Sequence, residues 1–484
     1  MARIEATKAY NTYVEEPALT SQNSSFTNVS HSNSLRRANE DSALIWNWNY
    51  ALLVDICGCL HDYRGNNSSM RGQHTMLIAD LHIHSRYSRA CSRDLSPETL
   101  WKWSQLKGID VVGTGDFTHP GWIAELQDKI VAEEGGLLRL RSGVPLPDVY
   151  PACCSDVRFL LTAEISCIYR RHDRTRKVHL VLLAPDFPTV IRINAALAGI
   201  GNLASDGRPI LGLDACRLLE MMLEISPEIM VIPAHAWTPH FSVFGAFSGF
   251  DSLEECFGDL TPHIRAIETG LSSDPAMNRR LPALDGIQLI SCSDAHSPAK
   301  LGREATLFNV LPDYAAITMA LATGVGLAGT IEFFPQEGKY YLDGHRDCGI
   351  CLQPDQTRSY NGRCPKCGRK LTVGVLHRVE ELARRTVAEQ PDGFPPFESI
   401  VPLVELIASI AGFGTASKRV QSIYFGLLEH LGSEFYILRE APEDVIARAS
   451  SQAVATAITN MRKGIVQISP GYDGEFGKIM PVPA

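Results

Sequence analysis

Between residues 76 and 309 the chain repeats one pattern, in which a short apolar, β-branched run ends in His, Asp or Glu and a helical or loop stretch follows. The runs do not alternate between apolar and polar positions, which is typical of strands covered on both faces, as in a parallel sheet. Such runs with crossovers predict a closed or nearly closed α/β barrel, and an open doubly wound sheet is the competing architecture. The seven runs are 76–84, 109–117, 157–166, 177–184, 229–237, 264–270 and 287–296.

The connection between the first two runs carries helix signals at both of its ends. Ser96 is of a type favoured at the N-cap, and Pro97 suits the first helical turn. Gly108 is of the type that most often follows the end of a helix. The spacing therefore predicts a helix over 97–107.

The end of the chain changes to a helical pattern. After the Pro- and Gly-rich linker 390–397, apolar residues recur at the i, i+3 and i+4 spacing of amphipathic helices. The helical stretches are 398–412, 417–432 and 442–464, each closed by Gly, and a β-like tail follows at 464–479. These patterns predict a small helical domain.

Residues 1–75 differ from the rest of the chain, because they are rich in Asn and Ser and show no sustained period. We expect a disordered extension, or upstream sequence from a misassigned start at Met1, whose removal leaves the activity intact. The segment lacks a basic region followed by an apolar one, so no secretory signal is visible. No run of 18 apolar residues occurs, and we expect no membrane-spanning helix.

Composition limits the size, partners and compartment. At ~150 residues per domain, 484 residues correspond to about three domains, and we assign a barrel to 76–335, a cysteine module to 336–390 and a helical domain to 391–484. The net charge is −9, so contact with nucleic acid requires a local basic patch. An odd count of 13 Cys in a long chain disfavours a secreted disulfide framework, so we expect a cytoplasmic protein.

Residue types that bind metals recur where the predicted strands end. His82 and His84 are two residues apart in a strand, so both imidazoles point to one side. Asp294 and His296 repeat this geometry in the last run. Nine such groups would repel one another and be costly to desolvate unless cations neutralised them, which predicts a multi-metal site. The candidate ligands are His82, His84, Asp116, His119, Glu164, His179, His235, Asp294 and His296.

This ligand set predicts the chemistry. Imidazole and carboxylate ligands suit Zn, Mn or Fe and suit Ca poorly. Mg is a further candidate for the barrel metals. Clustered metals ~3.5–4 Å apart act on phosphate esters by activating water and stabilising the entering and leaving oxygens. We therefore expect phosphoester hydrolysis. Asp80 and Ser293 either orient the imidazoles or form ordinary strand-end hydrogen bonds, and the sequence does not choose between these readings.

At this point the chain resembles a known family. DLHIHS (80–85), Glu164, His179, His235 and SDAHS (293–297) are similar to the PHP (polymerase and histidinol phosphatase) phosphoesterases. The resemblance implies a distorted seven-stranded barrel with up to three metals. Two features depart from the pattern. The usual TDH reads TGDFTH, so the ligand is either Asp116 or His119, and the carboxylate expected after the first HxH is displaced, with Asp94 the nearest candidate.

A second metal site is indicated by four cysteines. Cys348 and Cys351, then twelve residues, then Cys364 and Cys367 have the spacing of a zinc ribbon. Four thiolates form a closed tetrahedral shell, so we expect one structural zinc.

The same module is basic. Ten Lys/Arg and five Asp/Glu between 339 and 385 give a local charge of +5, and tyrosines are interspersed. Such a patch neutralises phosphates and stacks on bases, although zinc ribbons also bind proteins. The candidate DNA contacts are His345, Arg346, Arg363, Lys366, Arg369 and Lys370, with Trp237 from the barrel.

A narrower resemblance covers 76 to the end of the chain. The segments GTGDFTHPGW (113–122), PAHAWTPHFSVFGAFSGFDSLEECFG (233–258), ETGLSSDPAMN (268–278), SCSDAHSPAKLGREA (291–305) and TIEFFPQEGKYYLDGHRDC (330–348), followed by the ribbon and helices, look like endonuclease Q. That family nicks DNA on the 5′ side of deaminated bases (uracil, hypoxanthine, xanthine) and at abasic sites.

The endonuclease Q resemblance implies roles for residues and partners. Asp294, Glu164 and His84 would serve catalysis through the metals, and Asp294→Asn is expected to abolish cleavage while DNA binding survives. Since a lesion is read most cheaply by base flipping, Trp237, Phe241 and Phe244 are candidates for the pocket, although packing explains them equally well. A sliding clamp is a further possible partner, without an evident binding motif at the C-terminus.

Two other functions compete. A histidinol-phosphatase-like enzyme for small molecules needs neither ribbon nor helical region, which argues against it. A degenerate barrel serving as a DNA-binding or helicase-accessory module would not retain nearly all the ligands. The sequence therefore favours a metal-dependent DNA endonuclease.

Overall fold

Each of the seven apolar runs contains a β-strand. The computed structural model describes residues 76–482, and the expectations for residues 1–75 lie outside them. The strands of the seven runs are β1 (Leu77–Asp80), β2 (Val111–Gly113), β5 (Arg158–Arg171), β6 (Arg174–Ala184), β8 (Met230–Pro233), β9 (Ala266–Glu268) and β10 (Gln288–Ile290).

Most of these strands belong to one mixed sheet. Its main path runs β15-β12-β11-β1-β2-β5-β4-β3, and β6 pairs with both β5 and β8. β9 and β10 form a separate parallel pair, and an isolated parallel bridge between Ile83 and Ala295 connects the segment after β1 to the segment after β10. The fold is thus a mixed α/β fold. The remaining sheet strands are β3 (Ile130–Ala132), β4 (Leu138–Leu140), β7 (Ile210–Leu211), β11 (Ala305–Phe308), β12 (Leu327–Phe333) and β15 (Phe397–Ile400).

The sheet is not parallel throughout, which differs from the expectation from the apolar runs. β1, β2 and β5 are parallel, but β5 pairs with β6 antiparallel over eleven residue pairs, and β6 pairs with β8 antiparallel. The turn between β5 and β6 is His172–Asp173, and both residues have positive φ (51° and 57°). A two-residue turn of this kind matches the strand twist and closes a hairpin. The strands β5 and β6 are therefore buried on both faces although a tight turn, and not a crossover helix, connects them.

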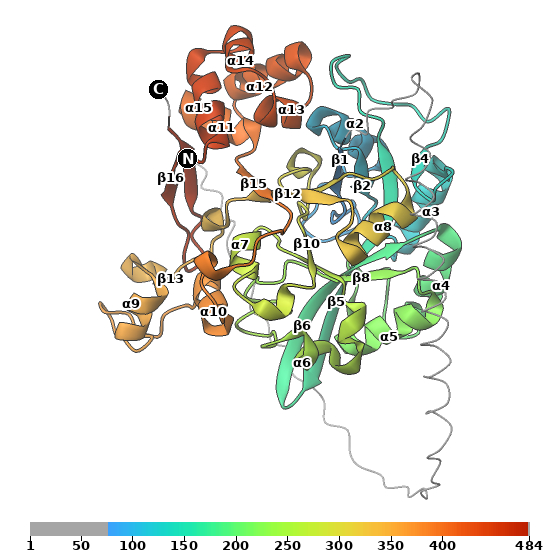
Figure 1. Cartoon of the computed structure of the whole chain (residues 1–484). Helices are drawn as coiled ribbons and strands as arrows, with labels where there is room; N and C mark the ends of the chain where they lie inside the picture. Colours follow the sequence, from blue (N-terminus) through green and yellow to red (C-terminus); the bar gives the residue numbers. More distant parts are fainter. Residues whose placement is uncertain (1–75, 483–484) are drawn as a thin grey trace, which may run out of the picture. The chain divides into compact units, whose positions relative to one another are not determined.

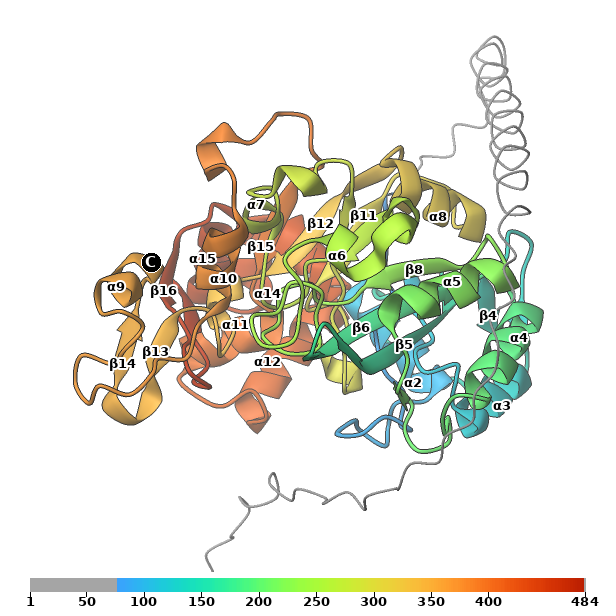
Figure 2. The ribbon, with the colours of Figure 1, turned by 90° about the horizontal axis from the view of Figure 1, so that it is seen from below.

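Helices cover the sheet and complete its core (Figures 1 and 2). The predicted helix over 97–107 is confirmed as α2 (Pro97–Lys107), with Ser96 as N-cap and Gly108 in the left-handed conformation at its end. Two buried apolar clusters fill the space on either side of the strands. The other helices of this region include α3 (Pro120–Lys129), α4 (Phe187–Ala198), α5 (Ala215–Ile225), α6 (Leu253–Phe257), α7 (Pro275–Asn278) and α8 (Tyr314–Thr323).

The C-terminal stretches are helical with two corrections. Residues 398–400 are not helical but belong to β15, which pairs in parallel with β12 and so extends the main sheet. Pro402 explains the shift, since the residue before a proline is disfavoured in a helix. The stretch 442–464 is two helices, because Ser451 is an N-cap that starts a new one. The helices are α11 (Leu403–Ala411), α12 (Lys418–Leu431), α13 (Glu434–Arg439), α14 (Glu443–Ala449) and α15 (Gln452–Arg462).

Between β12 and β15 the chain forms the cysteine module. It contains β13 (Asp343–His345), β14 (Ile350–Leu352), α9 (Pro354–Ser359) and α10 (Val375–Leu382). The predicted β-like tail is confirmed as the antiparallel pair β16 (Val466–Ser469) and β17 (Lys478–Pro481). Within residues 76–482, the structure has no helix with the length and apolarity to cross a membrane.

Candidate metal centre

Two groups of metal-binding side chains share one carboxylate. The first contains His82, His84, Glu164 and Asp294, and the second contains Glu164, His179 and His235. Within each group, one donor atom per residue lies within 4.8 Å of all the others. The two groups meet because β5 carries Glu164 and its hairpin partner β6 carries His179 two register positions away. The two groups are therefore adjacent, and each could hold a divalent cation.

Every imidazole of the two groups is held by a second protein group through the ring nitrogen that faces away from the centre. Such partners fix the tautomer and leave the other nitrogen free to bind a metal. The pairs are His82 Nδ1 with Glu268 Oε2 (2.9 Å), His84 Nδ1 with Asp116 Oδ1 (3.0 Å), His179 Nε2 with Ser166 Oγ (3.1 Å) and His235 Nδ1 with Thr238 Oγ1 (3.0 Å).

The donor set fits divalent cations by a direct test. His82 Nε2 is buried and has no hydrogen-bond partner. It faces Glu164 Oε2 at 3.5 Å and Asp294 Oδ1 at 3.7 Å. An unpartnered buried nitrogen between two carboxylates costs free energy unless a cation joins them. Imidazole with carboxylate is the ligand chemistry of Zn²⁺ or Mn²⁺.

The protonation states of Asp116 and His179 suit a metal centre, whereas burial is outweighed by nearby carboxylates at His82 and His84 and their pKa values are raised. Burial acts to raise the pKa of Asp116, but His84 and Ser85 outweigh it and hold the pKa below its ordinary value. Burial lowers the pKa of His179 to about 4, so its ring is neutral at neutral pH and offers a lone pair. The backbone at Asp116, His235 and Asp294 has positive φ, a strained conformation that recurs at functional sites.

Asp116 and His119, the two candidate ligands after the second strand, both lie outside the donor groups. Asp116 is fully buried and accepts hydrogen bonds from Ser85, so it supports His84 from behind and stands outside both donor groups. His119 also lies outside the groups, because its side chain caps α3 by accepting from the Gly121 N–H. His296 is a third exception, since it is one-third exposed at the edge of the centre, with its ring 4.6 Å from that of His84.

Asp94, Asp80 and Ser293 take no direct part in the two groups. Asp94 is exposed and interacts with Ser92. Asp80 accepts from the Ser293 N–H at 3.0 Å and the Ser293 hydroxyl at 2.6 Å, so these two residues join β1 to the segment after β10. Their contacts are therefore ordinary hydrogen bonds at strand ends.

Two residues that pattern reasoning missed lie at the centre. Glu268 ends β9, where the ETG sequence after an apolar run was the available signal. Arg208 donates from Nη1 to Glu164 Oε2 at 3.1 Å. Its loop approaches closely because Gly207 has no side chain, and a Cβ there would collide with Asp116. No sequence period marks Arg208, since its place depends on this loop.

The cysteine module brings together a different set from the one predicted. The donor group is His345, Cys348, Cys364 and Cys367, and Cys351 lies outside it. The missed signal is a repeat, since HRDCG (345–349) and CPKCG (364–368) both place a ligand, two residues, Cys and Gly in order. Both glycines have positive φ, 64° and 74°, as tight knuckles require. One nitrogen and three sulfurs suit a closed structural zinc site.

This correction gives a prediction for zinc binding. His345→Ala should lose the module's zinc and unfold the module locally, because three ligands remain and structural zinc supports folding. Cys351→Ser should retain the zinc, since its thiol is outside the group. Zinc content by mass spectrometry and the absorption of Co²⁺-substituted protein measure both effects. Loss of zinc in Cys351→Ser with retention in His345→Ala would restore the four-cysteine set.

The candidate DNA contacts separate into buried and exposed residues. Trp237 is 1% exposed and donates to Asn278 Oδ1 at 2.7 Å, so its role is packing, as is that of Phe244. His345 belongs to the cysteine-module donor group. Within residues 76–482, the five cationic candidates are exposed and form no ion pair, so they are available to phosphates. They are Arg346, Arg363, Lys366, Arg369 and Lys370.

A buried pair of acids lies beside β9. Glu304 and Glu332 are fully buried, and Glu332 accepts from the hydroxyls of Thr269 and Ser291 at 2.9 and 3.0 Å. Burial raises the pKa of Glu332 to about 8, and burial with the neighbouring Glu332 carboxyl raises the pKa of Glu304. The folded state therefore holds a proton here at neutral pH.

The pair predicts a pH dependence of stability. Between pH ~4.5 and ~8 the folded chain keeps a proton on Glu332 that the unfolded chain has released, so stability falls as the pH rises. Glu332→Gln should remove part of this fall and raise Tm at pH 8 by several degrees relative to wild type. Thermal unfolding at pH 5 to 8 measures it, with the exposed Glu381→Gln as control. Parallel curves for wild type and Glu332→Gln would contradict the assignment.

Comparison with known proteins gives consistent similarities. A family model described as the MJ0043 C-terminal domain matches residues 402–465. The chain is 33% identical to the lesion-specific endonuclease PfuEndoQ from Pyrococcus furiosus, covering 84% of this chain and 95% of that one with a TM-score of 0.73. A complex of endonuclease Q with a 27-mer duplex carrying an abasic lesion at the active site matches at 33% identity, 84% and 97% coverage and a TM-score of 0.72. The uncharacterized protein MJ0043 of Methanocaldococcus jannaschii is 33% identical over 253 residues, which span 51% of this chain and only 31% of that protein.

The fold and the shared-carboxylate centre define a metal-dependent hydrolase of the nuclease class with a mixed α/β fold. The similarity to endonuclease Q extends over nearly all of the described residues and nearly all of the solved chains. The chain belongs to the endonuclease Q family.

Proposed function

We propose that this protein is a metal-dependent DNA repair endonuclease that cuts duplex DNA at abasic sites and on the 5′ side of deaminated bases. The observation that carries the proposal is the pair of donor groups that share Glu164. Two adjacent cations are suited to phosphodiester hydrolysis because they stabilise both the entering and the leaving oxygen. Family membership and the abasic-site complex of endonuclease Q support DNA as the substrate.

The chain's own residues have distinct roles in this proposal. Divalent ions, when bound, would supply an activated water and positive charge at the phosphate. Glu164 would hold both ions, and His82, His84 and Asp294 would complete the first group. The partners behind the imidazoles would keep the rings in place. Arg208 contacts Glu164 and is placed to pair with a phosphate oxygen once cations engage that carboxylate.

The finer organisation is also part of the proposal. We assign a seven-stranded PHP-type barrel to 76–335, a zinc ribbon to 336–390 and a helical domain to 391–484. The exposed cations of the ribbon would neutralise phosphates beside the cut site. No cysteine among residues 76–482 forms a disulfide, which suits a cytoplasmic protein.

The deciding experiment uses labelled duplexes with one abasic site, deoxyuridine or deoxyinosine, and an undamaged duplex as control. With Mg²⁺ or Mn²⁺ present, a single nick 5′ of each lesion and an intact control are expected. Turnover of p-nitrophenyl phosphate without any nicking would instead identify a small-molecule phosphatase. Asp294→Asn should bind the lesion duplex without cutting it, and nicking by this variant at the wild-type rate would contradict the site.

A further inference from the structure

We infer that the β5–β6 hairpin and the loop after β8 form a second DNA-contact surface, which holds the lesion strand on the His179 side of the metal centre. This inference rests on the proposed endonuclease function. It differs from the ribbon patch because the surface is continuous with a candidate metal ligand. Its residues are Arg170, Lys177, His240, Phe241 and Phe247.

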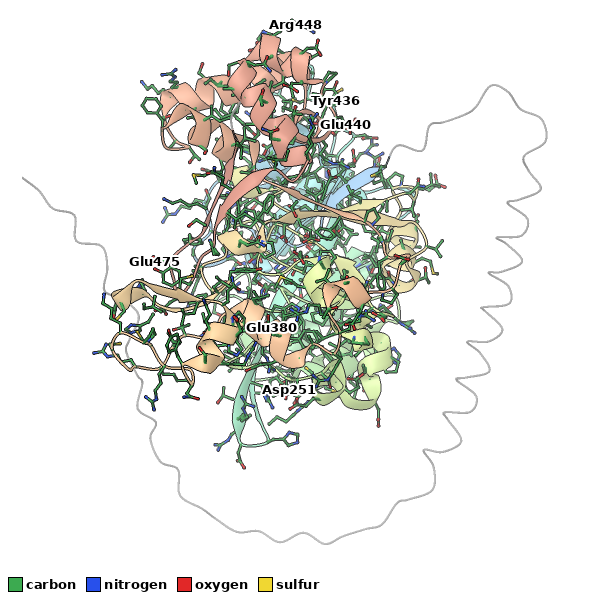
Figure 3. All side chains as sticks on the ribbon, turned by 60° about the vertical axis from the view of Figure 1, so that its left-hand side comes forward. Asp251, Glu380, Tyr436, Glu440, Arg448 and Glu475 are labelled. Atoms are coloured by element: carbon green, nitrogen blue, oxygen red, sulfur yellow. The ribbon has the colours of Figure 1, made fainter. Side chains whose placement is uncertain are left out.

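The hairpin starts at the metal centre and reaches into solvent. His179 pairs with Ser166 in the ladder, and five more residue pairs follow before the turn, ending with Arg171 and Arg174. At ~3.3 Å per residue the tip is about 17 Å from His179, which corresponds to about five nucleotides of one DNA strand. Figures 1 and 3 show the hairpin end projecting beyond the helices.

The hairpin tip carries more cations than its internal ion pairs use. Residues 170–177 (RRHDRTRK) carry five cations and one acid, a local charge of +4. Arg171 and Arg176 are used internally, with Asp214 at 2.5 Å and Glu255 at 2.9 Å respectively.

The other three cations of the hairpin are divided between its faces. Arg170 and Lys177 lie on the face of His179, and Arg174 lies on the opposite face with Arg171 and Arg176. Arg170 meets Asp173 at 3.4 Å, with both side chains at least three-quarters exposed, so this pair contributes little. Lys177 is half-buried and forms no ion pair within residues 76–482, so Arg170 and Lys177 are the cations available on this face. Phosphates of a strand leaving the metal centre would neutralise these cations.

The loop after β8 supplies aromatic rings beside the same ligand. The Phe241 ring lies 4.7 Å from that of His179, and Lys177 Nζ lies 5.1 Å from the Phe241 centroid, which connects loop and hairpin. His240 and Phe247 stack at 4.6 Å with an interplanar angle of 16°, and Phe247 is 49% exposed. Phe241 also has a positive φ of 62°, rare for a bulky residue.

Exposed, stacked rings next to cations are typical of protein surfaces that bind nucleic-acid strands. Bases stack on such rings with little sequence preference, while lysine and arginine pair with the backbone. A protein partner would not explain why the surface begins at His179, one of the ligands that would face the cleaved phosphate. DNA distorted at a lesion offers both the unstacked base and the phosphates that this surface accepts.

The test measures single-turnover nicking of an abasic duplex by the full chain as enzyme concentration and salt vary. Arg170→Ala/Lys177→Ala should raise the half-saturating concentration about tenfold at low salt and reduce the slope of its logarithm against log salt by about two. His240→Ala/Phe247→Ala should raise it about fivefold or more without a change in salt slope. The maximal rate should stay at the wild-type value in both, since neither pair contains a metal ligand.

Matched controls separate this inference from its alternatives. Ile191→Ala/Arg192→Ala removes one exposed apolar and one cationic side chain from α4 and should change neither quantity, and circular dichroism checks that all variants fold. Two further duplexes are shortened to three base pairs, one on the 5′ side and one on the 3′ side of the lesion. Only one of them should raise the half-saturating concentration of wild type, and the hairpin variant should show no additional rise with that duplex. Wild-type nicking with unchanged constants in both variants would overturn the surface alone. Failure of wild type to nick any lesion duplex would overturn the proposed function and this surface with it.

Discussion

Glu164→Gln should abolish lesion-dependent nicking, by a factor of roughly a thousand or more, because a single substitution removes the carboxylate common to both donor groups. An amide cannot bridge two cations, and it leaves Arg208 beside an uncharged partner. The stable metal content should fall from about three ions per chain, two at the centre and one in the cysteine module, towards the single zinc of the module. Nicking of an abasic duplex and metal analysis by mass spectrometry measure the two effects.

A matched control for this variant lies on the C-terminal helical region. Glu440 is exposed there (Figure 3), so Glu440→Gln makes the same chemical change without touching the centre. It should keep wild-type nicking and metal content. If Glu164→Gln retained three ions and normal nicking, the shared-carboxylate centre would be wrong.

The second large effect concerns stability. Glu434 of α13 forms a buried ion pair with Lys107 of α2, with Oε2 2.6 Å from Nζ and both side chains at most 4% exposed. The same carboxylate accepts from the Tyr424 hydroxyl at 2.7 Å and the Leu403 N–H at 3.0 Å. Glu434→Ala should lower the free energy of unfolding by about 3–5 kcal/mol, because it leaves a buried ammonium and other donors without a partner. Urea unfolding followed by circular dichroism measures the change.

A double substitution isolates the charge effect. Lys107→Met/Glu434→Leu removes both charges and keeps apolar volume, so it should recover much of the stability that Glu434→Ala loses. The pair joins a helix near the start of the described chain to one near its end, so the loss should reduce the cooperativity between these regions. A Glu434→Ala protein as stable as wild type would show that the pair does not hold the helical region in place.

The strands and α2 were predictable because their signals are local. Apolar runs, a capping Ser96 and a terminal Gly108 act through neighbouring residues, so they survive the absence of any tertiary information. The antiparallel β5–β6 hairpin was missed because its turn is made by His172 and Asp173, whose positive φ no strong turn motif announces. Strand direction depends on that turn, and the runs alone carried no information on it.

The division within the site follows the same physics. Residue types at strand ends were sufficient to nominate His82, His84, Glu164, His179, His235 and Asp294, all of which the structure gathers into two groups. That neither Asp116 nor His119 belongs to a donor group could not be read from TGDFTH, because one supports His84 and the other caps a helix. Those orientations are set by backbone conformation and by neighbours distant in sequence.

The sequence by itself determined the kind of protein, since metal-binding residues at strand ends, a cysteine module and a basic segment are composition and spacing, which do not depend on the fold's details. Tertiary structure alone decided which groups share Glu164, which histidine replaces Cys351 and where Arg208 lies. Each of these depends on a loop or turn that brings residues tens to hundreds of positions apart within a few ångströms, and local patterns carry no information about such contacts.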